Sequence, residues 1–408
     1  MSGSVEIAKR IDQPKRVFAY TDEPELGFPL DFSRRIPELD GLRGIAIGMV
    51  IFFHVVTLAI AARPTLPLGY ILATTRLFWS GVDLFFVLSG FLIGGILLDA
   101  RDSPNYFKTF YVRRFCRILP LYFLFIGLVA TAYQFVYRPI GAPLNGIFEG
   151  RLPWYWYFSF AQNLRMAKLN TTGAAIMSVT WSLAVEEQFY LVLPAIVRFV
   201  RRSALPYVFI AGIVIAPLVR LFIIFRFPTS FVATYALLPC RMDTLFVGAL
   251  CAYGLREPRV WRWLVKSRTA VWTGFFVLLA GMAGLNASMN ASSGVPFLLS
   301  MLSLGYGWMA VFYATAISLA LTESASFFSR AMRWRMLTGL GTIAYSVYLF
   351  HLGIYGLCFW FLRHGWPLTS WKDFEVTLFG LAVTVAFGEL LWRYFERPIV
   401  RWGHHWEY

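Results

Sequence analysis

Residues 36–62, IPELDGLRGIAIGMVIFFHVVTLAIAA, are apolar enough to span a bilayer, yet they contain Arg43 near one end and His54 in the middle. About 20 apolar residues cross the hydrocarbon core as a helix. Arg43 and His54 lie about 16 Å apart along such a helix and on nearly the same face. Because an ionisable side chain at mid-bilayer is costly, we interpret this helix as part of a functional site; a histidine hydrogen-bonded for packing is the alternative. Gly44 and Gly48 predict close approach of a neighbouring helix.

The composition is typical of a membrane protein. Of the 408 residues, 58% are hydrophobic and only 14% are charged, whereas a soluble domain has about 25% charged residues. The net charge of +15 is carried mostly between the apolar stretches, so we expect a lipid bilayer and not a nucleic acid as its partner. The four cysteines have no CxxC spacing, which predicts free thiols and no metal site.

Apolar stretches recur along the chain and predict an all-α polytopic protein with about ten transmembrane helices. They cover 42–62, 78–98, 118–137, 179–199, 205–225, 231–254, 270–288, 295–321, 339–362 and 376–395. Cationic residues are about three times as frequent on the side of the amino terminus as on the other side, which predicts that both termini are cytoplasmic.

The expected organisation has three parts. A polar cytoplasmic tail over 1–35 shows no cleavable signal peptide, a membrane domain covers 36–398, and a short cytoplasmic tail covers 399–408. The protein is expected to be multi-pass in the inner (cytoplasmic) membrane. The segment 138–178, rich in aromatic residues, is predicted to be re-entrant or interfacial.

Ionisable side chains recur at similar depths in different predicted spans and predict an acid–base chamber. Its expected catalytic residues are His54, Glu186, Asp243 and His351. His54 is the candidate base because an imidazole titrates near neutral pH. The candidates for contact with the acceptor or the oxyanion are Arg241, Glu187, Trp181 and Tyr348.

A second group of candidate residues lies at the start of the third predicted span. Arg114 and Arg117 are three residues apart, and Arg113 and Arg117 are four apart, so one helix face presents two or three guanidinium groups. Guanidinium groups bind phosphate bidentately, and a helix start favours anions. The cluster predicts a phosphorylated ligand; ordinary anchoring at the membrane surface is the alternative.

Six segments resemble motifs of the membrane acyltransferase-3 family, the integral-membrane O-acyltransferases of bacterial surface glycans. They are IPELDGLRGIAIGMVIFFHV, GVDLFFVLSGFLIGGILL, RRFCRILPLYF, VTWSLAVEEQFYLVLP, CRMDTLFVGAL and IAYSVYLFHLGIYG. They occur in the order of the family and are spread over residues 36–356. The resemblance therefore covers nearly all of the chain except the tail and the end of the last predicted span.

The resemblance implies an acyltransferase domain that takes acyl groups from cytoplasmic acyl-CoA. His54 is similar to the catalytic histidine of the family, and Arg114 and Arg117 to its Arg-x-x-Arg pair, which is expected to hold the phosphates of coenzyme A. Arg43, Glu186, Arg241, Asp243 and His351 match other characteristic positions. Many relatives carry an extracytoplasmic SGNH-type hydrolase domain, and we expect none in this chain, which stops at Tyr408.

The resulting hypothesis is an O-acyltransferase that moves an acyl group, most simply acetyl, to a hydroxyl of an extracytoplasmic carbohydrate or glycolipid. Acyl-CoA would bind Arg113, Arg114, Arg117 and Arg43, while His54 acts as general base or as transient acyl carrier. The alternative is a proton-coupled transporter of a lipid-linked sugar or small acid, in which the buried ionisable groups form the relay.

Overall fold

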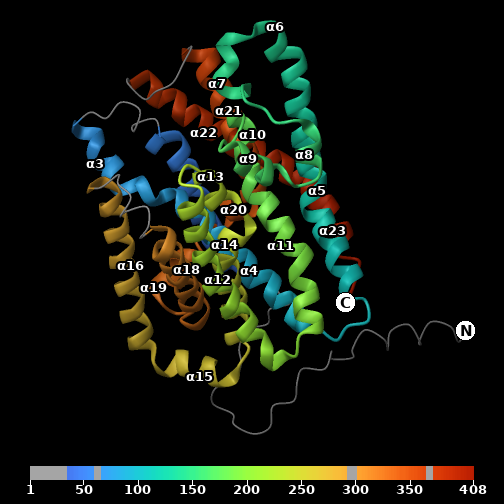
Figure 1. The fold of residues 1–408 in the computed structure, drawn as a ribbon, viewed down its shortest axis with the longest axis vertical. Coiled ribbons are helices and arrows are strands. Elements are labelled where there is room, and N and C mark those ends of the chain that lie inside the picture. The colour runs from blue at the N-terminus through green and yellow to red at the C-terminus, as the bar shows by residue number, and fades with distance from the viewer. Residues whose placement is uncertain (1–34, 59–65, 292–300, 364–370) are drawn as a thin grey trace, which may run out of the picture. The chain divides into compact units, whose positions relative to one another are not determined.

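The computed structural model describes residues 35–58, 66–291, 301–363 and 371–408, and these residues form helices joined by turns (Figure 1). The long helices are α1 (Pro37–Phe52), α3 (Leu66–Thr75), α4 (Gly81–Asp99), α5 (Tyr106–Ala132), α11 (Thr180–Phe199), α12 (Leu205–Arg226), α14 (Leu238–Gly254), α16 (Arg268–Ala291), α18 (Tyr306–Thr322), α21 (Ala344–Arg363) and α22 (Trp371–Leu391). The short ones are α6 (Arg138–Ile140), α7 (Asn145–Phe148), α8 (Trp154–Phe158), α9 (Gln162–Leu169), α10 (Ala175–Ser178), α13 (Phe231–Ala236), α15 (Pro258–Lys266), α19 (Phe327–Met332), α20 (Arg335–Thr342) and α23 (Arg397–Gly403).

The predicted class, an all-α polytopic membrane protein, is confirmed. Among the described residues, nine helices are long and apolar enough to cross a membrane. The remaining predicted span, 179–199, is α11, a helix of 20 residues, whose glutamates Glu186 and Glu187 lower its hydropathy. The predicted tail up to residue 34, residues 59–62 of the first span and residues 295–300 of the eighth lie outside the described residues.

Helix α4 lies at the centre of the described bundle. Its sequence is apolar on all sides, which favours a fully buried helix, and 83% of the span to which it belongs is buried. It packs against α1, α11, α14 and α18. The residues of α4 therefore face several helices at once, so different sides of this one helix can contribute residues to different sites.

Small residues bring α4 and α14 into backbone contact. A Cβ atom at Gly90 would lie 1.9 Å from the carbonyl oxygen of Leu245, and one at Gly248 would lie 2.1 Å from that of Val87. In a bilayer, where helices gain little from hydrophobic burial, this close packing is a main source of association. The two glycines thus fix the distance between these helices.

Helix α1 uses only one glycine of the predicted Gly44/Gly48 pair. A Cβ atom at Gly44 would lie 2.1 Å from the carbonyl oxygen of Leu337 in α20, whereas one at Gly48 would have no heavy atom within 4 Å. The second contact of α1 is made at Gly41, against Met332 at the end of α19. The prediction was wrong for Gly48. Sequence spacing shows that Gly44 and Gly48 share a helix face, but it does not show how far along that face the neighbouring helix reaches.

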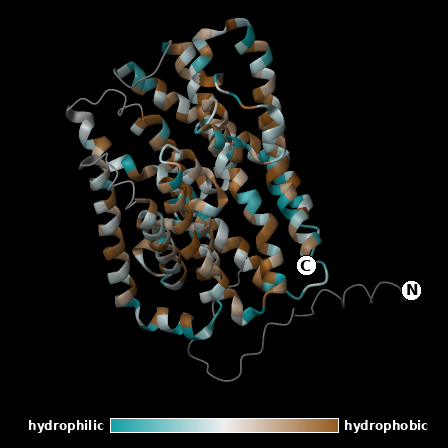
Figure 2. Ribbon diagram, in the orientation of Figure 1, coloured by the Kyte–Doolittle hydropathy of each residue, from teal (hydrophilic) through white to brown (hydrophobic). Residues whose placement is uncertain are grey.

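We call the end of the bundle at which α1 begins the first end, and the opposite end the second end. The start of α1 and the ends of α4 and α14 meet in a small cavity at the first end. Ion pairs join helices there, among them Arg256–Asp99 at 2.6 Å and Arg333–Glu38 at 2.7 Å. Figure 2 shows hydrophilic residues on α15 at this end, and Figure 1 shows α6 at the second end.

The segment predicted as a cytoplasmic tail over 399–408 is packed on the bundle. Helix α23 covers its first half. Beyond it, the carbonyl oxygen of Glu407 accepts a hydrogen bond from Thr109 Oγ1 at 2.8 Å, and Lys108 Nζ lies 4.5 Å from the centre of the Trp406 ring. The chain therefore lies against the start of α5, close to the arginine cluster.

Replacing Gly90 with alanine is expected to destabilise the protein by about 1–3 kcal/mol, because the added methyl group overlaps the backbone of α14. Gly48→Ala is the matched control, since space is open at that position. Thermal unfolding of both variants in the same detergent measures the difference. Equal transition midpoints would contradict the close packing of α4 on α14.

Candidate active site

A cavity of about 210 Å³ lies among α1, α4, α5, α11, α20 and α21. Its polar lining consists of Arg43, Ser89, Arg114, Arg117, Ser182, Glu186, Tyr190, Tyr345 and Tyr348. The remaining lining is apolar and comes largely from α4. Few convergent polar groups in an apolar cavity are typical of a ligand site.

The cavity is long. Its lining on α4 runs from Val82 to Ile96, a length of about 21 Å along the helix axis at ~1.5 Å per residue. An extended chain can lie along a space of this length.

Three arginines gather in the part of the cavity that lies nearest the first end of the bundle. Arg43 Nη1 lies 2.7 Å from Asp40 Oδ1, and Arg114 and Arg117 reach the same space from α5. Arg113, the fourth predicted member, turns toward the carboxyl-terminal segment: its Nε donates to the carbonyl oxygen of Trp406 at 2.9 Å. The structure thus brings three of the four predicted guanidinium groups together.

The arginine cluster makes this region strongly electropositive. Partial desolvation, followed by the positive charges of Arg113, Arg114 and Arg117, lowers the pKa of His404, which lies just beyond α23. Glu186 lines the same cavity from α11. An anion at the mouth of the cavity would be stabilised by the positive charges of the arginines.

The two predicted histidines lie side by side at the far end. His351 Nε2 lies 3.3 Å from His54 Nδ1, and the two ring centres are 5.1 Å apart. His351 is fully buried, whereas His54 is half-buried. His54 belongs to a π-helical turn, Phe53–Thr57, that continues α1. Such turns are frequent at functional sites.

Backbone contacts assign the protons of this pair. His54 Nδ1 lies 2.9 Å from the carbonyl oxygen of Val50, and His351 Nδ1 lies 2.8 Å from that of Tyr348. Because a carbonyl oxygen only accepts, both neutral rings carry their proton on Nδ1. His54 Nδ1–H is then shared with His351 Nε2, and His54 Nε2 keeps a free lone pair. That nitrogen is available as a base or a nucleophile.

Tyr348 adjoins both the cavity and the histidine pair. It lines the cavity, and its ring centre is 6.1 Å from that of His351. Its hydroxyl lies 2.6 Å from Ser182 Oγ and donates to the carbonyl oxygen of Val179 at 3.1 Å. The lining of the cavity, taken over the described part of the chain, includes neither histidine.

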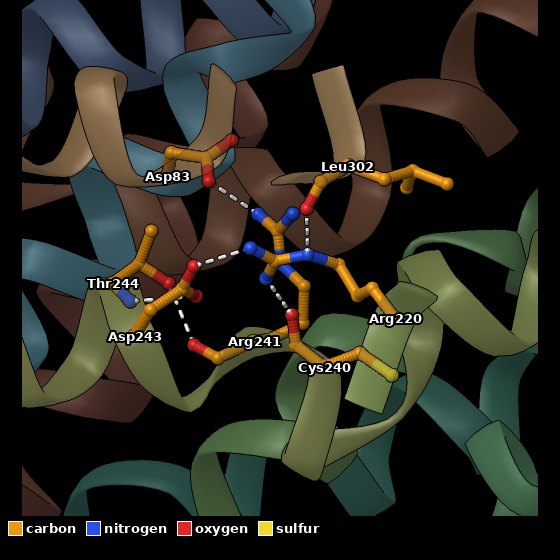
Figure 3. Close-up of polar contacts among 7 residues, drawn as sticks. All are labelled: Asp83, Arg220, Cys240, Arg241, Asp243, Thr244 and Leu302. Carbon is orange, nitrogen blue, oxygen red and sulfur yellow. Dashed lines mark hydrogen bonds and ion pairs between the residues drawn. The ribbon is translucent and has the colours of Figure 1, made fainter. Parts of the chain in front are cut away.

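Asp243 and Arg241 belong to a different buried cluster (Figure 3). Asp243 Oδ2 pairs with Arg220 Nη2 at 2.8 Å, and its Oδ1 accepts from the backbone N–H of Thr244 at 3.0 Å. Arg241 pairs with Asp83. All four charged side chains are at most 1% exposed. The structure therefore places the predicted catalytic carboxylate Asp243 in an ion pair and not against the histidines.

Aromatic rings surround this charge cluster. The guanidinium carbon of Arg241 lies 4.1 Å, and that of Arg220 4.8 Å, from the centre of the Tyr306 ring. The predicted acceptor contact Trp181 packs in the same region, 4.3 Å from the Tyr235 ring. Stacked rings stabilise buried guanidinium groups by cation–π attraction. Nε and Nη1 of Arg241 are buried without a hydrogen-bond partner in the structure.

Glu187 adjoins the cavity site without lining it. Its charge interacts with that of Arg114, and its Oε1 is buried without a hydrogen-bond partner in the structure. The neighbouring Gln188 donates to Asn163 Oδ1 at 2.9 Å. These contacts hold α9, in the predicted interfacial segment, against α11.

Sequence reasoning missed Arg220 and Ser182. Arg220 interrupts the apolar sequence of α12 and is fully buried, so the rule that singled out His54 also applies to it. Ser182 carries no comparable signal, because a serine inside a span is common and often bonds its own backbone. Within the described ranges, no group of three or more His, Cys, Asp or Glu side chains is placed to hold a metal ion.

Comparison with known proteins agrees with the family resemblance of the sequence motifs. Residues 36–393 match the family described as "Acyltransferase domain". The peptidoglycan O-acetyltransferase OatA of Listeria monocytogenes serovar 1/2a is 27% identical over 383 residues, which are 91% of this chain and 57% of that protein. A Staphylococcus aureus (strain COL) protein, provisionally named an O-acetyltransferase, is 26% identical over 390 residues, or 91% of this chain and 58% of its own length. No solved structure gives a significant match.

Removing Arg220 alone, by Arg220→Met, is expected to destabilise the protein by about 3–5 kcal/mol, because Asp243 is left buried without its partner. The double variant Arg220→Met/Asp243→Leu should recover most of that loss, since it buries no charge there. Thermal unfolding of both single variants and the double variant measures the coupling. Additive effects would show that the pair is not a structural unit. The acyl-transfer activity of the folded double variant tests the predicted catalytic role of Asp243.

Proposed function

The chain belongs to the membrane acyltransferase family, and from this premise we propose that it transfers an acyl group from acyl-CoA to a hydroxyl of a carbohydrate. The observation that supports the proposal is that one continuous cavity contains three arginines and extends to Tyr348, which adjoins the histidine pair. The chain spans a little over half the length of the relatives described above.

The shape and charge of the cavity suit coenzyme A. Its phosphates would contact Arg43, Arg114 and Arg117, because guanidinium groups bind phosphate bidentately. The unbranched pantetheine arm would lie along α4, and the nucleotide would stay near the arginines that hold its phosphates. The thioester would then reach the neighbourhood of Tyr348. Arg113, directed elsewhere, would contribute through its charge alone.

The chemistry follows from the free lone pair of His54. As the acceptor oxygen attacks the thioester carbonyl, His54 Nε2 takes the hydroxyl proton. The carbon–sulfur bond breaks, and the same proton passes to the thiolate, so that an ester and free coenzyme A are formed. The alternative uses the lone pair as nucleophile and forms a transient acyl-histidine. Labelled acetyl-CoA without acceptor separates the routes, because only the second leaves label on the protein.

His351 acts as a positioning residue in this proposal. Its Nε2 accepts from His54 Nδ1–H, which fixes the tautomer of His54 and stabilises the cation formed during transfer. Glu186 would adjoin the bound donor, because it lines the same cavity. Arg241, Asp243 and Trp181 support the site from the far side of α4, while Glu187 acts on Arg114.

The distribution of cations supports a membrane orientation. We place the first end in the cytoplasm, where acyl-CoA is found, because cations gather on that side by about three to one. Both termini are then cytoplasmic, and the acceptor approaches from the second end. The name of the Listeria relative refers to peptidoglycan, so an extracytoplasmic glycan is the proposed acceptor, acetyl the proposed group and the inner membrane the proposed location.

Binding and turnover of acetyl-CoA by the purified protein test the function. Arg114→Ala/Arg117→Ala should weaken binding by at least about tenfold, because each charge-assisted contact contributes about 1.5–3 kcal/mol. Arg113→Ala, the matched control, should weaken it much less. His54→Ala should bind acetyl-CoA normally and lose about 10²–10⁴-fold in turnover. A wild-type protein that neither binds nor consumes acetyl-CoA would contradict the proposal.

Substitutions at His351 test its positioning role. His351→Gln retains an oxygen that can accept from His54 Nδ1–H, whereas His351→Ala retains none. We expect the glutamine variant to keep more activity than the alanine variant, with similar donor affinity for both. Turnover measured from pH 5.5 to 8.5 is the readout. Equal activity and identical pH profiles would leave His351 a packing residue only.

A further inference from the structure

The cavity approaches the histidine pair without being lined by it. Tyr348, Phe85 and Ser182 line the cavity, whereas its lining among the described residues includes neither His54 nor His351. Tyr348 is a lining residue whose ring adjoins His351, with the ring centres 6.1 Å apart. His54 contacts His351 in turn. A thioester that occupied the cavity would therefore be separated from the catalytic imidazole by the Tyr348 side chain.

Several contacts hold Tyr348 in this position. Its hydroxyl is bound to Ser182 and to the carbonyl oxygen of Val179, both on the α11 side. Phe85 of α4 packs edge-on against its ring at 6.1 Å. Tyr348 is only 7% exposed. Both polar contacts are made by the hydroxyl group, so loss of that one atom would free the ring to rotate.

We propose that Tyr348, held by Ser182, is the partition that makes the enzyme select the acceptor hydroxyl over water. This proposal rests on the proposed function and adds a specificity-determining residue to it. With the tyrosine in place, the thioester is kept from the imidazole and from water that the imidazole would activate. Exclusion of water from a reactive intermediate is a recognised role of a closed site. Arrival of the acceptor displaces the ring and connects the cavity to the histidine pair.

The side reaction that the partition prevents is hydrolysis of the donor. A water oxygen forms a bond to the acyl carbon, the carbon–sulfur bond breaks, and the water proton passes through His54 to the thiolate. The products are the free carboxylic acid and coenzyme A. The reaction needs no acceptor, so it can be measured with acetyl-CoA alone as the release of free thiol.

Tyr348→Ala is expected to raise acceptor-independent hydrolysis of acetyl-CoA at least about tenfold over the wild type, and addition of His54→Ala should abolish the gain. Tyr348→Phe keeps the ring but removes both hydrogen bonds of its hydroxyl, and Ser182→Ala removes one of them, so both variants should give a smaller increase. Tyr355→Phe is the matched control: this tyrosine lies on the same helix, is 1% exposed and packs against Gly380. It should leave hydrolysis unchanged.

A folded Tyr348→Ala protein that binds acetyl-CoA as the wild type does, yet hydrolyses it no faster, would overturn the proposal. If that variant fails to fold, unchanged hydrolysis in both Tyr348→Phe and Ser182→Ala would overturn it equally. Transfer from acetyl-CoA to an N-acetylglucosamine oligosaccharide by the wild type is measured in parallel. Failure of transfer would count against the proposed function, whereas wild-type transfer without increased hydrolysis in the variants would count against the partition alone.

Discussion

The cost of burying charge in an apolar bundle determines the arrangement of this protein. Arg220 and Arg241 are both fully buried, and an unpaired guanidinium group in such a place would be unfavourable by several kcal/mol. Asp243 and Asp83 supply the opposite charges, and the Tyr306 ring lies against both guanidinium groups. The pairs join α12 to α14 and α14 to α4. Because each buried charge must lie beside its partner, the pairs fix the positions of these three helices relative to one another.

The rotation of α4 follows from these contacts and places the candidate active site. Asp83 faces α14, and Gly90 meets the same helix at backbone distance. Residues on the other side of α4, among them Phe85 and Ser89, then face the cavity. The charge cluster and the cavity thus share one helix. A change in the Asp83–Arg241 pair would reach the cavity through α4 without any residue of the pair contacting the donor.

The sequence allowed prediction of depth but not of direction around each helix. Depth followed from hydropathy and predicted that His54 and His351 lie together, as their contact shows. The helical spacing of Arg114 and Arg117 predicted one shared face, and both line the cavity. Asp243 was predicted at a depth similar to that of His54, yet it faces Arg220, because the pairing of charges across three helices is a property of the packed bundle. The π-helical turn that contains His54 could not be predicted either, because no residue type is characteristic of such a turn.

The separation of the arginines from the histidines has a consequence for transfer across a membrane. Coenzyme A is too polar to cross a bilayer, and the cavity leads from the first end only as far as Tyr348. His54 contacts His351, which adjoins that tyrosine, and is half-buried, so in the proposed function the acceptor has another side from which to approach. Only the acyl group would then have to pass Tyr348. With Tyr348 as the partition, an acyl group can be transferred from a donor on one side to an acceptor on the other while the helices stay packed. A transporter with alternating access, in contrast, moves one group of helices against another.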